Sequence, residues 1–275
     1  MRKLKNSVIA ITGAGSGIGQ ALAIQCARKG AKLALSDVNL QSLEATRVLC
    51  QETRAENILI EQVDVRDRDQ VDNWAKAAEN HFGEVNVVIN NAGVAMNVAF
   101  EQMKYDDLKW MMDINYWGVV HGCMSFLPLL KKAEWGHIVN VSSLFGLISI
   151  PNQTAYNSAK FAVRGLTEGL RMELEMAGYN IGVSCVHPGG IKTNIANSAR
   201  MGPSVGKQLS ADEFKDKFNK LLAKTTPEQA AKTIIDAIEN NHKRVLVGLD
   251  ARICDLMQRS APTFYQKVIK QALSF

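Results

Sequence analysis

The residues of this chain with the clearest chemical potential are Tyr156 and Lys160. They lie four residues apart in a segment, 156–176, whose apolar periodicity predicts a helix, so both side chains project from one face. A phenol with a pKa of about 10 is a poor base at neutral pH, but a neighbouring ammonium group favours the phenolate and lowers that pKa. Ser143 could donate a hydrogen bond to a reacting oxygen. The three residues therefore predict proton transfer to a developing alkoxide or from an alcohol.

A second tyrosine–lysine pair shows that this spacing alone is weak evidence. Tyr105 and Lys109 are also four residues apart, in the charged segment EQMKYDDLKW, which is typical of an exposed helix start. Tyr156 differs in context, because it follows a predicted buried strand in HIVNVSS, and Ser143 lies just beyond the carboxyl end of that strand. We therefore expect the reactive group at Tyr156.

A glycine-rich turn, TGAGSGIG, lies between the first predicted strand and the first predicted helix. Its glycines alternate at Gly13, Gly15, Gly17 and Gly19, which differs from the strict Gly-x-Gly-x-x-Gly spacing. Glycines nevertheless allow a tight turn and let a pyrophosphate approach backbone amides at a helix N-terminus. An ordinary strand-to-helix turn is the alternative, and the position after the first strand favours nucleotide binding.

An acidic residue, Asp37, ends the second predicted strand, 18 residues after Gly19. This separation is close to the roughly 20 residues expected for a carboxylate that binds the hydroxyls of the adenosine ribose. A carboxylate there would repel a ribose phosphate, and Ser16 occupies a position where a basic residue could bind one. Both positions favour NAD over NADP. Asp37 could instead cap the following helix.

Short apolar segments alternate along the chain with longer segments whose apolar residues recur every three or four positions. This alternation predicts an α/β protein with a doubly wound Rossmann fold, in which helices cover both faces of a parallel sheet of about seven strands. We interpret residues 1–275 as a single domain with a mobile substrate loop region at 193–225. The predicted strands are 8–12, 32–36, 58–62, 85–90, 137–142, 181–187 and 245–247, and the predicted helices include 18–28, 69–81, 107–127, 156–176 and 227–240.

Composition and charge disfavour several other classes of protein. Hydrophobic residues make up 47% of the chain and charged residues 21%, which is enough to form a core. The apolar run Val8–Ile11 is too short for an export signal, so we expect a cytoplasmic protein. The five cysteines and five histidines are scattered without metal-ligand spacing, so no metal site is predicted. The excess charge of +5 falls in residues 200–275, which hold 13 basic and 8 acidic residues. This excess could favour an anionic partner or a membrane surface, but the interspersed signs favour solvated helix faces. We expect no nucleic-acid partner.

Taken in order along the chain, these motifs resemble the short-chain dehydrogenase/reductase family. The resemblance covers about residues 6–248 and adds Asp64 in VDV, NNAG at 90–93, Asn115 and HPGGIKT at 187–193. It implies an NAD(P)-dependent oxidoreductase in which Tyr156 is the acid/base and Ser143 polarises the reacting oxygen. The family's usual separation of 13 residues between serine and tyrosine selects Ser143 over Ser142.

The same resemblance implies a role for each further motif residue. Lys160 would bind the nicotinamide ribose, and its charge together with that of an oxidised nicotinamide would lower the tyrosine pKa. Asn115 would hold a water in a proton relay. The predicted catalytic residues are thus Asn115, Ser143, Tyr156 and Lys160. The predicted cofactor-binding residues are Gly13, Gly15, Ser16, Gly17, Ile18, Gly19, Asp37, Asp64, Val65, Asn91, Ala92, Gly93, Tyr156, Lys160, Pro188, Gly189, Ile191 and Thr193.

The segments that we expect around the substrate are mostly apolar, which favours a hydrophobic alcohol or carbonyl substrate. They are residues 94–98, the loop 193–209, and Gly146, Leu147, Ile148 and Ile150. Trp110 and Trp117 are predicted to belong to the core or to a subunit interface and not to a ligand site. The terminal segment 250–275 predicts an amphipathic basic helix. In order of preference, it would cover the substrate cleft, pack at the interface of a homodimer or homotetramer, or touch a membrane.

Two other functions stay open at this point. A 3-oxoacyl-thioester reductase that uses NADPH is disfavoured by Asp37 and Ser16. A catalytically silent, nucleotide-sensing protein on the same fold is disfavoured by the complete set of Ser143, Tyr156 and Lys160. The leading hypothesis is an NAD-dependent enzyme that interconverts a secondary alcohol and a ketone, or acts on an aldehyde.

Overall fold

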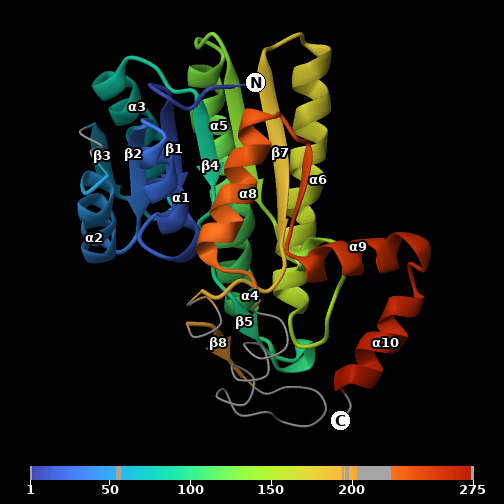
Figure 1. Cartoon of the computed structure of the whole chain (residues 1–275). Coiled ribbons are helices and arrows are strands. Elements are labelled where there is room, and N and C mark those ends of the chain that lie inside the picture. The colour runs from blue at the N-terminus through green and yellow to red at the C-terminus, as the bar shows by residue number, and fades with distance from the viewer. Residues whose placement is uncertain (1, 54–56, 194, 196–197, 203–223, 274–275) are drawn as a thin grey trace.

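The computed structural model describes residues 2–53, 57–193, 195, 198–202 and 224–273 (Figure 1). Within these residues, seven strands form one parallel sheet in the order β3-β2-β1-β4-β6-β7-β9. The strands are β1 (Val8–Thr12), β2 (Lys32–Asp37), β3 (Ile58–Gln62), β4 (Val87–Asn90), β6 (Gly136–Val141), β7 (Ile181–Pro188) and β9 (Arg244–Val247). The predicted doubly wound parallel sheet of about seven strands is confirmed.

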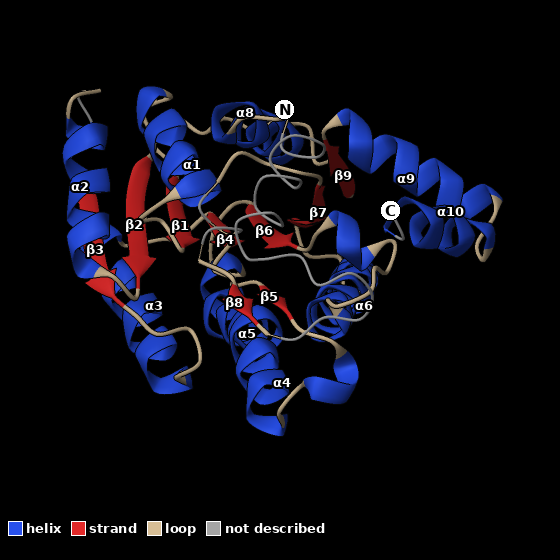
Figure 2. Ribbon diagram, turned by 90° about the horizontal axis from the view of Figure 1, so that it is seen from below, coloured by secondary structure: helices blue, strands red, loops and turns tan. Residues whose placement is uncertain are grey.

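Helices cover both faces of this sheet (Figure 2). One face packs against α1 (Gly17–Arg28), α2 (Leu40–Gln51) and α8 (Pro227–Glu239), and the other against α3 (Arg68–Phe82), α5 (Gly118–Leu130) and α6 (Thr154–Met176). Strands β1, β4, β6 and β7 are buried throughout, which explains why their sequences are near-continuous apolar runs without the alternation of a half-exposed strand. Among the described helices, none combines the length and the apolarity that a bilayer span requires.

The order of the strands reverses between β1 and β4, and this reversal opens a crevice at the carboxyl ends of the two strands. The hydroxyl of Thr12, at the end of β1, accepts hydrogen bonds from the backbone N–H groups of Asn91 and Ala92, both at 3.0 Å. Behind the crevice, the Asn90 Nδ2 group donates to Asn140 Oδ1 at 2.8 Å. These contacts fix the ends of β1, β4 and β6 relative to one another.

The predicted helix 107–127 is wrong as a continuous α-helix. The chain instead forms α4 (Tyr105–Met112), a π-helical turn at Asp113–Trp117, and then α5. A π-helical turn accommodates one more residue than an α-helical turn, so it changes the face on which every later side chain lies. Asn115, one of the predicted catalytic residues, lies within this turn.

The predicted single helix 250–275 is also wrong. Two helices, α9 (Leu249–Ser260) and α10 (Phe264–Leu273), meet at a break that contains Pro262, because proline interrupts helical hydrogen bonding. Residues 274–275 lie outside the described part of the chain, as do 194, 196–197 and 203–223 of the predicted mobile loop region. Two short turns, Phe100–Gln102 and Leu144–Gly146, and a small parallel pair, β5 (Met96–Asn97) with β8 (Arg200–Met201), complete the described elements.

Candidate active site

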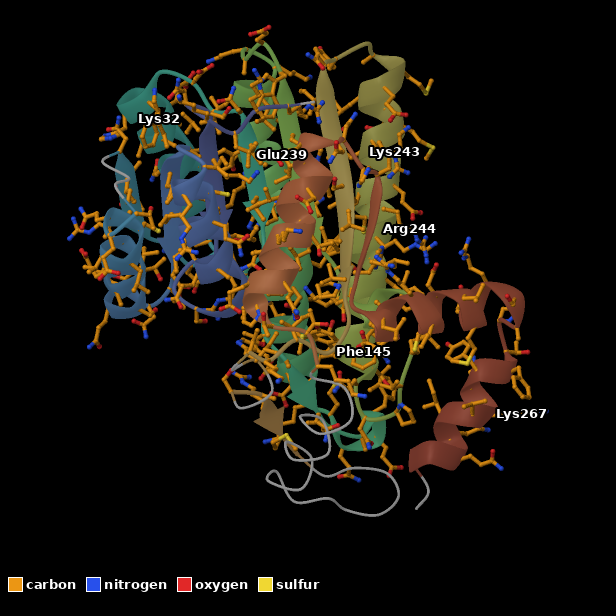
Figure 3. The ribbon with its side chains drawn as sticks, in the orientation of Figure 1. Lys32, Phe145, Glu239, Lys243, Arg244 and Lys267 are labelled. Atoms are coloured by element: carbon orange, nitrogen blue, oxygen red, sulfur yellow. The ribbon has the colours of Figure 1, made fainter. Side chains whose placement is uncertain are left out.

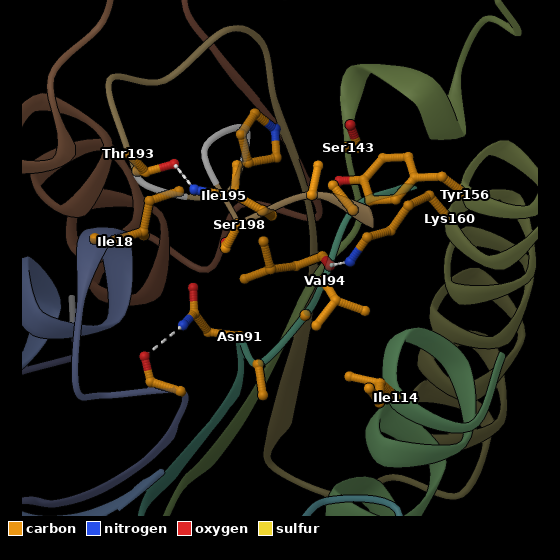
Figure 4. Close-up of a pocket in the computed structure, with 18 of the residues that line it drawn as sticks. Ile18, Asn91, Val94, Ile114, Ser143, Tyr156, Lys160, Thr193, Ile195 and Ser198 are labelled. Carbon is orange, nitrogen blue, oxygen red and sulfur yellow. Dashed lines mark hydrogen bonds between the residues drawn. The ribbon is translucent and has the colours of Figure 1, made fainter. Parts of the chain in front are cut away.

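A cavity of about 530 Å³ lies in the crevice where the strand order reverses (Figure 4). Most of the predicted site residues line it, namely Gly13, Ser16, Gly17, Ile18, Asp37, Asp64, Val65, Asn91, Ala92, Gly93, Ser143, Tyr156, Lys160, Pro188, Gly189, Ile191 and Thr193. The three others lie next to lining residues. The N–H of Gly15 donates to Asp37, Gly19 packs against the Gly13 carbonyl, and Asn115 is bonded to Val94. The structure thus brings residues from all the sequence motifs to one cavity.

The predicted reactive residues lie together at one end of the cavity. Helix α6 carries Tyr156 and Lys160, and Ser143 follows the carboxyl end of β6. The Lys160 Nζ atom lies 5.7 Å from the centre of the Tyr156 ring and donates to the Val141 carbonyl oxygen at 3.0 Å. The Ser143 hydroxyl accepts a hydrogen bond from the backbone N–H of Phe145 at 3.1 Å, which holds its oxygen in place. Figure 4 shows these three labelled side chains across the cavity from Ile18 and Thr193.

Burial shifts the pKa values of Tyr156 and Lys160, which lie at this end of the cavity. It raises the pKa of Tyr156 above its ordinary value, and the hydrogen bond with Ser143 offsets only part of that increase. Burial also lowers the pKa of the Lys160 ammonium group to about 8. Desolvation of the phenol thus outweighs the favourable contacts of the protein groups. The expected lowering of the tyrosine pKa also relied on the positive charge of a bound, oxidised nicotinamide, and it stays a prediction.

Asn115 is fully buried beside this corner, in the π-helical turn. Its Oδ1 atom accepts a hydrogen bond from the Val94 N–H at 3.0 Å, and its Nδ2 group donates to the Val94 carbonyl at 2.9 Å. A Cβ atom on Gly93 would lie 2.7 Å from Asn115 Oδ1, so only glycine fits there. The carboxamide thereby fixes the backbone that follows NNAG, and its predicted part in a water relay stays a prediction.

The other end of the cavity has the geometry of a pyrophosphate cradle. Gly13 and Gly17 have φ values of +65° and +55°, which L side chains rarely adopt. A Cβ atom on Gly17 would lie 3.2 Å from Thr193 Cγ2, so the glycine turn approaches the HPGGIKT segment closely. The first turn of α1 begins here and carries no acidic residue. Free N–H groups and the positive end of the helix dipole suit an anionic phosphate, so these residues fit a bound dinucleotide.

Asp37 lies at the end of β2, on the wall of the cavity. Its Oδ2 atom accepts a hydrogen bond from the Gly15 N–H, and its Oδ1 atom accepts one from the Asn39 N–H, both at 2.9 Å. The alternative that Asp37 caps α2 is wrong, because Asn39 is the capping residue and accepts from the Ser42 N–H at 3.0 Å. The carboxylate therefore belongs to the glycine turn and not to the helix.

Several lining residues were not expected from the sequence. Trp110, predicted to lie in the core or an interface and not in a ligand site, packs against an apolar core cluster and also lines the cavity, with the Arg200 guanidinium 3.6 Å from the centre of its ring. Gln153, the residue just before α6 and three positions before Tyr156, also lines it. Gly146, Leu147, Ile148 and Ile150 are not lining residues, because the chain turns at Leu144–Gly146 and presents Leu144 and Phe145 instead. Within the described residues, no cluster of three His, Cys, Asp or Glu side chains could hold a metal ion.

Comparison with known proteins agrees with this geometry. Residues 7–204 match the family model described as short chain dehydrogenase. A Mycobacterium tuberculosis protein, SadH, whose name assigns it to the oxidoreductases, is 45% identical over 269 residues, covering 98% of this chain and 96% of that protein. The 3-ketodihydrosphingosine reductase of Mus musculus is 33% identical over 249 residues, covering 86% of this chain and 70% of that enzyme.

A solved structure shows the same architecture with a nucleotide bound. It is a short-chain dehydrogenase/reductase from Burkholderia phymatum in complex with NAD, with a TM-score of 0.88, 31% sequence identity and 97% coverage of each chain. The chain therefore belongs to the short-chain dehydrogenase/reductase family of NAD(P)-dependent oxidoreductases.

Proposed function

We propose that this enzyme interconverts a hydrophobic secondary alcohol and the corresponding ketone, or acts on an aldehyde, with NAD as its preferred cofactor. One observation carries the proposal. A single cavity joins a buried proton donor, Tyr156 with Ser143, to a phosphate cradle and the carboxylate of Asp37. The bound nicotinamide would supply the hydride for reduction or accept it for oxidation.

The protein residues handle the proton. During reduction, the Tyr156 hydroxyl donates its proton to the carbonyl oxygen as negative charge develops there, and the Ser143 hydroxyl donates a hydrogen bond to the same oxygen. Lys160 has a pKa of about 8, so it is mostly protonated at neutral pH and places positive charge 5.7 Å from the phenol ring. During oxidation the direction of proton transfer reverses.

The preference for NAD rests on the charges around the adenosine end. Asp37 would accept hydrogen bonds from ribose hydroxyls and would repel a ribose phosphate. Arg66 lines the same part of the cavity, but Asp64 holds it in an ion pair at 2.5 Å. This pair lowers the pKa of Asp64 and raises that of Arg66, so the guanidinium charge is already matched.

The substrate end of the cavity supports a hydrophobic substrate with one polar contact. Its apolar wall includes Val94, Met96, Trp110, Ile114, Leu144, Phe145 and Ile195. Gln153 is the polar side chain nearest in sequence to Tyr156 on this wall, and a carboxamide there could bind a second substrate oxygen. The name of the mouse relative denotes reduction of a keto group, which is the reaction proposed here.

Two tyrosine variants test the proposal. Tyr156→Phe should lower turnover of hydrophobic ketones with NADH by about 10²- to 10⁴-fold, because it removes the acid/base, while the dissociation constant for NADH changes little. Tyr105→Phe is the matched control, since Tyr105 has the same spacing to a lysine but is 81% exposed. Turnover is followed by NADH absorbance and cofactor binding by NADH fluorescence.

The alternatives give different outcomes in the same assays. Equal losses in the two variants would refute the role of Tyr156. Tight NADH binding without turnover of any alcohol or ketone would favour a nucleotide sensor. Turnover of a 3-oxoacyl thioester with a strong preference for NADPH would favour the thioester reductase.

A further inference from the structure

The two C-terminal helices, α9 and α10, form a hairpin that projects from the side of the sheet beyond β9 (Figure 1). We call residues 249–273 the C-terminal hairpin. Its helices have one face against the body of the protein and one face directed away from it. Figure 3 shows Lys267 on α10, at the outer side of this projection.

The inner face of the hairpin is hydrogen-bonded to Gly190, which lines the cavity, and to Ser149, which follows the turn after Ser143. The Asp250 carboxylate accepts a hydrogen bond from the Gly190 N–H at 2.6 Å, and the Tyr265 hydroxyl accepts one from the Ser149 N–H at 3.2 Å. Tyr265 is buried in the same apolar cluster as Tyr156. These contacts hold the hairpin in one orientation, so its outer face is a defined surface.

The outer face carries a stripe of exposed apolar side chains. On α9, Leu249, Ile253 and Leu256 are 71%, 56% and 61% exposed, and their spacing of four and then three residues places them in one row. On α10, Phe264 and Val268 are 56% and 40% exposed and four residues apart. Five large apolar side chains exposed on two short helices form a patch of the kind that marks an interaction site.

In the described part of the hairpin, the exposed charged side chains are all basic. The basic residues Arg252, Arg259, Lys267 and Lys270 are exposed. The two acidic residues of the hairpin are directed inward: Asp250 is bonded to Gly190, and Asp255 is buried in ion pairs with Arg244 and Arg259. In the described part of the hairpin, exposed apolar residues flanked by basic and not by exposed acidic side chains match an interfacial helix on an anionic surface.

The same charges disfavour a second copy of this chain as the occupant. A twofold interface places each patch against itself, so Arg252 and Lys267 would approach their own copies or one another. Like charges across such an interface oppose association. A lipid surface offers anionic headgroups that bind the basic side chains and an apolar layer that buries the apolar side chains.

We propose that the outer face of the C-terminal hairpin, formed by Leu249, Ile253, Leu256, Phe264 and Val268 with Arg252 and Lys267, docks on an anionic lipid bilayer. The apolar side chains enter the boundary between headgroups and acyl chains, and the basic side chains contact the headgroups. The hairpin stays tied to the cavity in this arrangement, because the Asp250 carboxylate accepts a hydrogen bond from the N–H of Gly190, which lines the cavity.

Vesicle flotation with the full chain tests this proposal. Vesicles of phosphatidylcholine containing about 30% phosphatidylglycerol should bind the protein at an ionic strength of about 0.1 M, and binding should fall at about 1 M salt, where charges are screened beyond roughly 3 Å. Vesicles of phosphatidylcholine alone should bind it much less. The double variant Arg252→Glu/Lys267→Glu should weaken binding roughly thirtyfold or more, because each basic residue contributes about fivefold.

Matched variants separate the hairpin from the rest of the surface. Ile253→Gln/Leu256→Gln/Phe264→Gln should abolish flotation. Val48→Gln/Met176→Gln should not, although Val48 and Met176 are 50% and 88% exposed. Lys76→Glu/Lys104→Glu removes the same number of exposed basic residues elsewhere. NADH binding and thermal unfolding confirm that each variant folds.

Three results would overturn the proposal. The first is the absence of wild-type flotation with anionic vesicles. The second is unchanged flotation of both hairpin variants. The third is a wild-type oligomer that the apolar hairpin variant converts to a monomer by light scattering, because the outer face would then be a contact between copies of the chain.

Discussion

Replacing Asp37 with asparagine tests the proposed cofactor preference most directly. The carboxylate is held by two backbone N–H groups, those of Gly15 and Asn39, so its position at the adenosine end is fixed. A single negative charge about 5 Å from a ribose phosphate of charge about −2 raises the free energy by about 2 kcal/mol in water and about 3 kcal/mol at an effective dielectric constant near 40. Wild-type protein should therefore bind NADH more tightly than NADPH by at least about thirtyfold.

Asp37→Asn keeps the shape of the side chain but removes its charge. The ratio of the dissociation constants for NADPH and NADH should then fall by about 30- to 150-fold, because repulsion of the phosphate disappears and the ribose hydroxyls lose a charged acceptor. Fluorescence titration with both cofactors measures the ratio, and added salt should reduce it in the wild type more than in the variant.

Glu61→Gln is the matched control for a general change in charge. Glu61 is exposed on β3, one residue before Gln62, which pairs with Asp37 in the sheet. This substitution should leave the cofactor ratio nearly unchanged. Wild-type protein that binds NADPH as tightly as NADH, or an Asp37→Asn ratio within about threefold of the wild type, would refute the electrostatic argument.

Three further predictions concern stability and substrate binding. Gly122→Ala would place a Cβ atom 1.9 Å from Asn90 Oδ1, so it should lower the free energy of unfolding, measured in urea, by about 2 to 4 kcal/mol. Gly165→Ala is the control, because a Cβ atom there has open space in α6 and should not destabilise the protein. Tyr265→Phe removes the acceptor for the Ser149 N–H and should raise KM about fivefold with little change in kcat; a kcat effect alone would contradict this. Burial lowers the pKa of His137 to about 3 and that of His187 to about 4, so the unfolded chain takes up protons first as the pH falls. The free energy of unfolding should therefore decline between about pH 6.5 and 4, by about 1.4 kcal/mol per pH unit for each histidine, and a flat profile there would contradict it.

The sheet could be predicted from the sequence because a strand covered on both faces must be apolar throughout. Each predicted strand is present, and the bounds differ by only one or two residues. The largest difference is at β4, which begins at Val87 and not at Val85. Asn86 lies just before this strand, and there the Val8 N–H donates to the Asn86 side-chain oxygen at 2.8 Å while the Asn86 N–H donates to the Val8 carbonyl at 3.0 Å.

The helices were harder to predict where a single residue interrupts regular α-helical geometry without changing the apolar periodicity. Apolar periodicity continues through Asp113–Trp117, so it does not reveal the π-helical turn. The break between α9 and α10 was visible at Pro262, which periodicity alone does not register. The contact of Arg200 with Trp110 depends on the approach of residues far apart in the sequence, for which local patterns give no signal.

The two tyrosine–lysine pairs have the same spacing but differ in burial and in their contacts. Lys109 forms an ion pair with Asp113 in an exposed helix, whereas Lys160 is buried and contacts Val141. Burial opposes charge on both Tyr156 and Lys160, since it raises the tyrosine pKa and lowers the lysine pKa. The protein groups therefore keep the proton on the Tyr156 oxygen, which suits donation to a ketone. Removal of a proton from an alcohol requires further positive charge beside the ring, and the cavity joins this corner to a site shaped for a nicotinamide nucleotide.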